Sequence, residues 1–132
     1  MNMRTTYFIS GHRNISDKEF KDNYVPALIN AAAEDHSLFV VGDYYGVDIM
    51  AQNFLVDILN INPDRITVYH MFESPRNINS KITRTVGGFK SDDERDAAMT
   101  MNSNKDIAFV RDPKKWSGTG ENILRRHKLK SS

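Results

Sequence analysis

The sequence predicts an α/β fold with an open parallel sheet of four to five strands and helices on both faces. Short apolar runs alternate with longer segments of helical spacing, as in chains that form parallel sheets. One run, residues 38–41, is apolar throughout, as expected for a strand covered on both faces. Because 132 residues fit one domain, we treat residues 1–132 as a single domain.

Three further segments have the short length and the β-branched and aromatic composition of strands. They are residues 5–10, 65–69 and 106–110. The expected helices cover residues 17–34, 47–59 and 92–102, and a last helix begins at residues 118–120.

Capping signals mark the expected helix starts. Ser16 and Glu19 form a capping-box pattern, and Ser91 precedes an acidic first turn. Pro26 lies inside the first expected helix, which it either kinks or splits in two.

Residues 70–91 form a long stretch without a clear pattern, although a short helix at residues 78–85 is an alternative. Long loops in a compact domain are usually functional or mobile. Arg76 and Arg84 could therefore belong to a lid that closes over phosphate, with Gly87 and Gly88 as its hinge, and Arg76 is a candidate ligand-binding residue. A mobile surface loop and a subunit contact are the alternatives.

Composition excludes several classes of function. The chain has no cysteine, which removes disulfides, thiolate nucleophiles and cysteine–zinc sites. Its net charge of +1 argues against a nucleic-acid partner. No apolar run approaches the roughly 20 residues of a membrane span, and the start has no signal-peptide core, so we expect a cytoplasmic protein without a membrane partner. The histidines show no metal-ligand spacing, and we expect neither a metal site nor a cofactor.

Three loops directly follow expected strands, and the fold would bring them to the sheet edge where ligands of parallel sheets bind. The first contains Gly11, His12 and Arg13. Glycine allows close approach of the backbone to a ligand, and arginine can grip a phosphate or carboxylate. The alternative is a simple turn with Arg13 paired to a nearby acid.

The second loop provides Gly42, Asp43, Tyr44, Gly46 and Asp48 as candidate ligand-binding residues. Two glycines before a helix suit the approach of an anion to free N–H groups. Tyr44 and Tyr45 could stack on a base, although one of them could instead cover the sheet edge. Asp48 could accept hydrogen bonds from ribose hydroxyls or simply favour the helix dipole.

The third loop contains Ser117, Gly118, Thr119 and Gly120 at the start of the last helix. Small and hydroxylated residues at a helix N-terminus predict an anion site. The alternative is an ordinary Ser or Thr N-cap.

Four segments resemble the SLOG superfamily of Rossmann-like nucleotide-binding domains. They are ISGHR at residues 9–13, VGDYYGVD at 41–48, DIAF at 106–109 and SGT at 117–119. This resemblance implies a Rossmann-like fold, a nucleotide or nucleotide-derived small molecule as ligand, and assembly as a homodimer or higher homo-oligomer.

Within that superfamily, ERDAAM at residues 94–99 and SGTGE at 117–121 resemble two motifs of the Lonely Guy phosphoribohydrolases, which cleave N-glycosidic bonds of nucleotides. By that resemblance, Arg95 would hold phosphate or ribose and Glu121 would be the catalytic acid. The family glutamate falls where this chain has Asn122. Glu94 is a further catalytic candidate, because a carboxylate near the ribose stabilises developing positive charge. A solvated first helical turn is the alternative for Glu94.

The sequence thus predicts a nucleotide-binding protein that hydrolyses an N-glycosidic bond. A non-catalytic sensor of a nucleotide signal is the alternative, since a sensor needs the same anion sites but no aligned carboxylate. A DNA-binding module is a third hypothesis, which the balanced charge disfavours.

Overall fold

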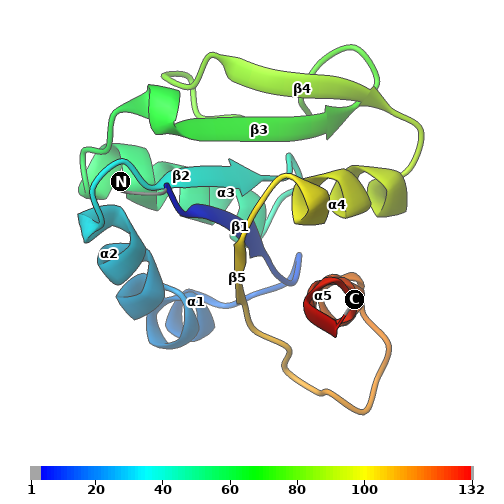
Figure 1. Ribbon diagram of the computed structural model, residues 1–132. Coiled ribbons are helices and arrows are strands. Elements are labelled where there is room, and N and C mark those ends of the chain that lie inside the picture. Colours follow the sequence, from blue (N-terminus) through cyan, green and yellow to red (C-terminus); the bar gives the residue numbers. More distant parts are fainter. Residues whose placement is uncertain (1–3, 132) are drawn as a thin grey trace.

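The computed structural model describes residues 4–131 and contains an all-parallel sheet in the order β4-β3-β2-β1-β5 (Figure 1). The strands are β1 Thr6–Ser10, β2 Leu38–Val41, β3 Ile66–Met71, β4 Arg84–Phe89 and β5 Lys105–Ala108. The predicted α/β fold with an open parallel sheet is therefore confirmed. The strand order reverses between β1 and β5, and such a switch point opens a crevice beyond the strand ends.

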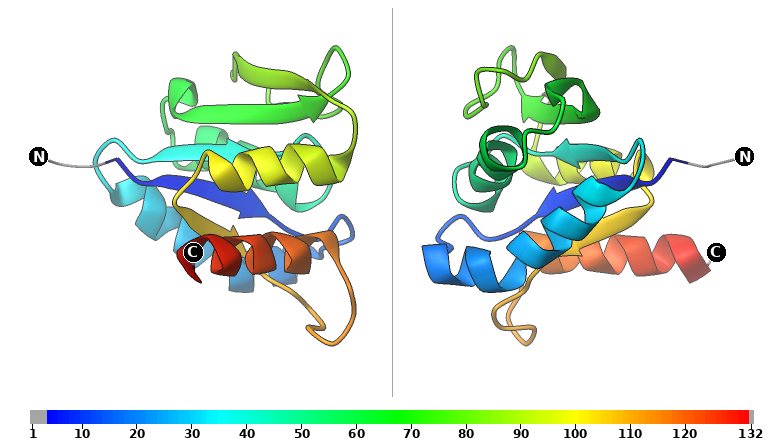
Figure 2. Two further views of the ribbon diagram at one scale, coloured as in Figure 1. Left: turned by 45° about the vertical axis from the view of Figure 1, so that its right-hand side comes forward. Right: turned by 90° about the vertical axis from the view of Figure 1, so that its left-hand side faces the viewer.

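Helices cover both faces of this sheet (Figure 2). One face carries α1 Asp17–Asn23, α2 Val25–Ala33 and α3 Val47–Asn53, which continues as the π-helical turn η1 Phe54–Ile58. The other carries α4 Asp92–Met101 and α5 Gly118–Ser131. A short 3-10 turn, η2 Pro63–Arg65, leads into β3. No helix within residues 4–131 combines the length and apolar character needed to cross a membrane.

Pro26 splits the first predicted helix, which was one of the two expected outcomes. Proline has no N–H to donate, and here it lies in the first turn of α2, where no donor is needed. Tyr24 separates α1 from α2. The predicted capping box is confirmed: Glu19 N donates to Ser16 Oγ at 3.0 Å, and Ser16 N donates to Glu19 Oε1 at 3.1 Å.

The prediction of a stretch without regular structure is confirmed for residues 72–83 and wrong for residues 84–89, which form β4. The alternative of a short helix at residues 78–85 is wrong. β4 is an exposed edge strand, so it lacks the apolar pattern that marks the other strands. Gly87 and Gly88 lie inside it and form no hinge. A Cβ at Gly87 would lie 2.1 Å from Cε1 of His70, and Gly88 has a φ of +88°. These glycines allow the close contact with β3 and an irregular register.

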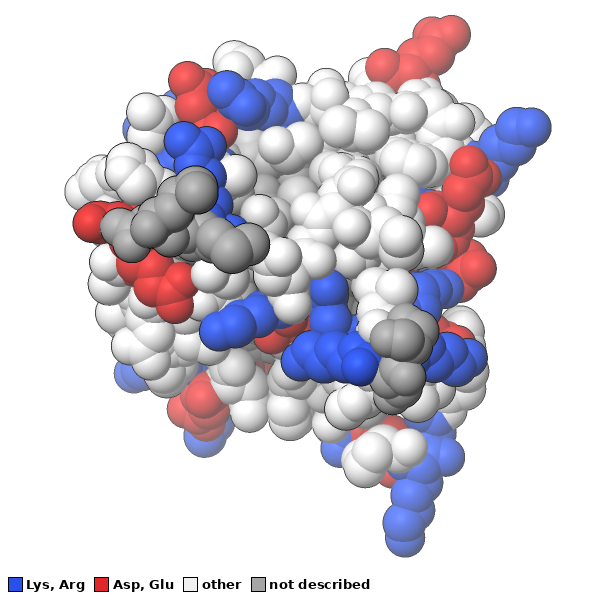
Figure 3. Space-filling model, in the orientation of Figure 1, with Lys and Arg blue, Asp and Glu red and all other residues white. Residues whose placement is uncertain are grey.

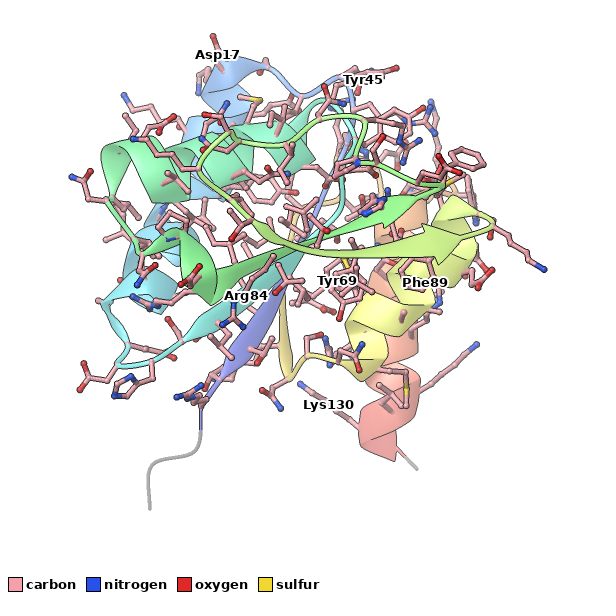
Figure 4. The ribbon with its side chains drawn as sticks, turned by 90° about the horizontal axis from the view of Figure 1, so that it is seen from above. Asp17, Tyr45, Tyr69, Arg84, Phe89 and Lys130 are labelled. Carbon is pink, nitrogen blue, oxygen red and sulfur yellow. The ribbon has the colours of Figure 1, made fainter. Side chains whose placement is uncertain are left out.

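Two hydrophobic clusters lie on opposite faces of the sheet. The larger packs α1, α2 and α3 against the side chains of Ile9 and Val41. The smaller contains Phe8 and Val40 with Met99 from α4. Tyr69 also belongs to it, and the ring of Phe89 stacks on that of Tyr69 with centroids 5.9 Å apart (Figure 4). Side chains therefore alternate along β1 and β2 as in a strand buried on both faces.

Figure 3 shows Lys and Arg side chains gathered low on one face, near β5 and α5, while the surface over β3 and β4 is largely uncharged. Acidic side chains are interspersed with the basic ones elsewhere on this face.

Candidate functional site

A cavity of about 540 Å³ opens at the carboxyl ends of β1 and β2, between the N-terminal ends of α4 and α5. All three loops predicted from the sequence contribute to its wall. The predicted ligand-binding residues that line it are Gly11, His12, Arg13, Gly42, Tyr44, Asp48, Ser117, Gly118 and Thr119. The cavity therefore occupies the switch point of the sheet, and its volume lies in the range of small-molecule sites.

Asp43 lies beneath this cavity instead of lining it. Its fully buried carboxylate accepts hydrogen bonds from Arg76 N and Nη2, both at 2.8 Å, and from Arg95 Nη1 at 2.9 Å. Burial opposes ionisation of Asp43, but the hydrogen bonds from Arg76 and the charge of Arg95 outweigh it and lower the pKa. Asp43 thus joins the loop after β2 to α4 and to the segment after β3.

Arg76, which the sequence suggested as a lid residue, is held within the fold. Besides Asp43, its Nη2 contacts Asp92 Oδ1 at 2.9 Å. Arg84, the other arginine of that stretch, begins β4 at the opposite end of the strand from Phe89 (Figure 4). The two arginines therefore do not act together on one side of the cavity.

Arg95 lines the cavity, but carboxylates of the chain already occupy its guanidinium. Its Nη1 bonds to Asp43, and its Nε and Nη2 bond to Asp96 Oδ1 at 3.1 and 2.9 Å. Asp92 Oδ1 lies 3.2 Å from Nη1. A phosphate would have to displace these partners, so Arg95 organises the carboxylates around the cavity.

Asp48 reaches the cavity from α3 across the end of β2. Gly42 makes this possible, because a Cβ there would lie 2.5 Å from Asp48 Oδ2 and 2.9 Å from Arg95 Cζ. Tyr44 N donates to Asp48 Oδ2 at 3.1 Å. Burial raises the pKa of Asp48 to about 7, against the opposing charge of Arg95. This carboxyl group can therefore exchange a proton near neutral pH.

A chain of polar contacts crosses the cavity between α4 and α5. Asn122 Nδ2 donates to Asp96 Oδ2 at 3.1 Å, and Arg125 Nη1 donates to Asn122 Oδ1 at 2.6 Å. Arg125 also pairs with Asp93. Burial raises the pKa of Asp96 although Arg95 and Asn122 favour its charged form. Asn122 and Arg125 both line the cavity, and neither was predicted from the sequence as a site residue.

Tyr44 does not offer a free ring face to a base, contrary to one expectation. The Cζ atoms of Arg13 and Arg76 lie 4.3 and 4.4 Å from its ring centroid. The ring of Tyr45 also packs against that of Tyr44, with the ring centroids 4.8 Å apart. Tyr45 and Trp116, which are 55% and 79% exposed, are instead the accessible aromatic side chains of the cavity wall.

Gly46 also has a structural role. Its φ is +79°, and a Cβ there would lie 2.4 Å from the carbonyl oxygen of Arg13. Gly46 therefore lets the first two loops pass each other, and it does not line the cavity. Gly11 has a similar packing role, because a Cβ there would lie 2.5 Å from Cγ2 of Val47.

His12 connects the first loop to the segment after β5. Its Nε2 accepts a hydrogen bond from Arg111 N at 3.1 Å. Partial burial, and then the charge of Arg111, lower the pKa of His12. The imidazole is therefore neutral near pH 7, with Nδ1 carrying its proton.

The third loop begins α5 as predicted, and Ser117 acts as an N-cap. Ser117 Oγ accepts a hydrogen bond from Gly120 N at 3.0 Å, so Gly120 serves the helix and does not line the cavity. The N–H groups of Gly118 and Thr119 belong to the first turn, where a helix offers no carbonyl partner. The space next to Gly118 is open, since a Cβ there would have no neighbour within 4 Å.

Glu94 and Glu121, which were two of the catalytic candidates, do not line the cavity. Glu94 Oε2 accepts a hydrogen bond from Lys90 N at 3.3 Å and so caps the start of α4. One residue on a helix is a turn of about 100°, so the neighbours Arg95 and Asn122 face the cavity instead. The carboxylates that line it are Asp48, Asp92, Asp93 and Asp96.

Comparisons of the chain with models of protein families, with curated proteins and with solved structures yield no match. The resemblance to the SLOG superfamily stays a prediction from the sequence.

Proposed function

We propose that the cavity binds a nucleotide or a nucleotide-derived small molecule. One observation carries the proposal: the cavity combines cationic side chains and a helix N-terminus with accessible aromatic rings and buried carboxyl groups. A nucleotide needs each of these, because it has an anionic phosphate, a planar base and a sugar between them.

The anionic part of the ligand would bind at the N-terminus of α5. The first-turn N–H groups of Gly118 and Thr119 are suited to an anion, and the helix dipole adds to the attraction. Arg13 and Arg125 line the same cavity and carry positive charge. Arg125 is paired with Asp93, which is largely exposed, so a phosphate can compete for this guanidinium.

The base would contact Trp116 and Tyr45. Large, exposed aromatic rings at the wall of a polar cavity provide stacking surfaces, and stacking tolerates different bases. Most of the Trp116 side chain is exposed, so its burial contributes little to the stability of the protein in the absence of a ligand.

Hydrolysis of an N-glycosidic bond is a further candidate activity, which the carboxyl groups favour. Asp48 has a pKa of about 7, and Asp96 is close enough to contribute to that rise. Protonated Asp48 would donate its proton to the leaving base as the bond from sugar carbon to base nitrogen breaks. Water would add to the sugar carbon and pass its proton to Asp96, as in hydrolysis by carboxylate pairs. A sensor of a nucleotide signal would use the same cavity without this step.

The test combines thermal stability with product analysis. Nucleoside mono-, di- and triphosphates and ADP-ribose are incubated with the protein, its melting temperature is recorded, and the mixture is analysed by chromatography. Stabilisation with release of a base, abolished in Asp48→Asn, supports the hydrolase. Stabilisation without release supports the sensor. A melting temperature that no compound raises would contradict nucleotide binding altogether.

A further inference from the structure

Ser10, at the carboxyl end of β1, has a buried hydroxyl group with no hydrogen-bond partner. It is 6% exposed, and among the described side chains its Oγ is the buried polar atom for which no partner is found. Ser10 also lines the cavity. Buried hydroxyl groups are normally paired, and an unpaired one destabilises the fold, so each exception requires an explanation.

The sheet explains why this hydroxyl lacks a partner. Ser10 lies two residues after Phe8, so its side chain is on the face that α4 and α5 cover. Ala108 of β5 is the partner of Ser10 on one side. On the other side, Ile9 pairs with Val41 of β2, so Ser10 lies next to Gly42, the residue that follows β2. Neither neighbour has a polar side chain. The cavity, which Ser10 lines, is the side from which a ligand could offer this hydroxyl a partner.

The surroundings indicate which chemical group fits there. At Gly42, the position of an absent Cβ is 2.5 Å from Asp48 Oδ2 and 3.0 Å from Arg95 Nη2. The floor of the cavity thus combines an acid, a cation and a hydroxyl that can both donate and accept. Asp48 and Asp96 would repel an anion, and Arg95 would repel a cation. A neutral hydroxyl group matches all of them.

We propose that the Ser10 hydroxyl, together with the Asp48 carboxyl group, binds the ribose hydroxyls of the ligand and makes the cavity selective for ribonucleotides over deoxyribonucleotides. This inference rests on the proposed function. It places the sugar on the floor beside β1 and the phosphate at the N-terminus of α5. A site that hydrogen-bonds a ligand hydroxyl discriminates strongly against the analogue without it, since its own polar groups are then left unpaired.

The test measures binding of ribonucleoside 5′-monophosphates and of their 2′-deoxy and 2′,3′-dideoxy forms to the wild-type protein and to Ser10→Ala. Ser37→Ala is the matched control, because Ser37 is buried too but its Oγ has partners: it donates to Ala31 O at 2.6 Å and accepts from Arg65 Nη2 at 2.5 Å. We expect the wild-type protein to prefer the ribonucleotide over the dideoxy form at least about tenfold. Ser10→Ala should lose most of that preference, and Ser37→Ala should retain it.

The unliganded variants give a second readout. Removal of an unpaired hydroxyl should leave the melting temperature of Ser10→Ala equal to or above that of the wild type, whereas Ser37→Ala should melt at a lower temperature. Equal binding of ribo and dideoxy forms, or an unchanged preference in Ser10→Ala, would overturn this inference alone. A melting temperature of Ser10→Ala as low as that of Ser37→Ala would reveal an internal partner and also overturn it. If no nucleotide binds, the proposed function and this inference both fail.

Discussion

Two groups of polar side chains meet at the carboxyl edge of the sheet, and they differ in how their hydrogen bonds are satisfied. Around Asp43, each polar group is bonded to another part of the chain. Around Ser10 and Asp48, a hydroxyl has no partner and a carboxyl group has a raised pKa. The first arrangement stabilises the fold. The second leaves a hydroxyl group unpaired and a carboxyl group with a strongly shifted pKa, and such groups are frequent at functional sites.

The largest expected change in stability comes from the side chains around Asp43, whose hydrogen bonds are all satisfied within the chain. Asp43→Ala would remove the fully buried one of the two carboxylates that Arg76 and Arg95 share, and would leave them the more exposed Asp92. Loss of one member of a buried ion pair costs about 3–5 kcal/mol, and we expect that decrease in the free energy of unfolding measured in urea. Asp22→Asn, which removes a pair with Lys18 on the surface, is the control and should have little effect. A small change for Asp43→Ala would show that the two groups do not differ.

The two aspartates should also respond to pH with opposite signs. The raised pKa of Asp48 means that the folded protein holds a proton that the unfolded chain loses. Stability from this group is present below about pH 4 and is lost as pH rises to about 7, by up to about 1.4 kcal/mol per pH unit. The lowered pKa of Asp43 has the reverse effect, with stability present above about pH 4 and lost in more acidic solution.

Melting temperatures of the wild type, Asp43→Asn and Asp48→Asn across pH 3–8 measure this difference. Relative to the wild type, Asp48→Asn should become more stable as pH rises from 4 to 7. The melting temperature of Asp43→Asn should approach that of the wild type only near pH 3, where the wild type loses the stability that ionised Asp43 provides. Parallel curves for all three proteins would contradict the assignment of opposite shifts.

A smaller effect is expected where the two groups meet at Gly42. In Gly42→Ala, the added methyl group would overlap Asp48 Oδ2 and crowd Arg95. Overpacking of this kind costs about 1–3 kcal/mol and would displace the floor of the cavity, so ligand binding should be lost as well. Gly118→Ala is the control, because its methyl group would meet no atom within 4 Å. Similar stability losses in both variants would argue against the crowding explanation.

The smallest change in stability is expected for Trp116→Ala. Most surface substitutions away from special features change stability by less than about 0.5 kcal/mol, and Trp116 is 79% exposed. Its nucleotide affinity should nevertheless fall, since stacking on an aromatic ring is worth about 1–3 kcal/mol per base. Chemical denaturation and calorimetric titration of the same variant separate these effects. Unchanged affinity would remove Trp116 from the site.

The sequence predicted the parts of the fold that depend on apolar pattern and capping. Residues 38–41 are apolar because both faces of β2 are covered, and this is visible without a structure. β4 was missed because its residues are exposed, so no periodicity marks them. The common location of the three loops followed from the parallel sheet alone.

The features of the site that were not predicted from the sequence depend on the direction of side chains and on their hydrogen-bond partners. Glu121 and Asn122 differ by one residue, and only Asn122 faces the cavity. The resemblance to a family whose glutamate falls at the position of Asn122 was the available signal. Nothing in the sequence shows that two arginines cover Tyr44 or that the hydroxyl of Ser10 lacks a partner. Both facts depend on which residues the fold brings together.

Trp116 allows the most direct measurement of the central claim, because it is the single tryptophan of the chain and lies on the cavity wall. Its fluorescence is followed while ribonucleotides are added to the wild type and to Gly42→Ala. We predict a saturable change in the wild type that Gly42→Ala lacks. A wild-type signal that does not respond to any nucleotide, or an identical response in Gly42→Ala, would contradict nucleotide binding in this cavity.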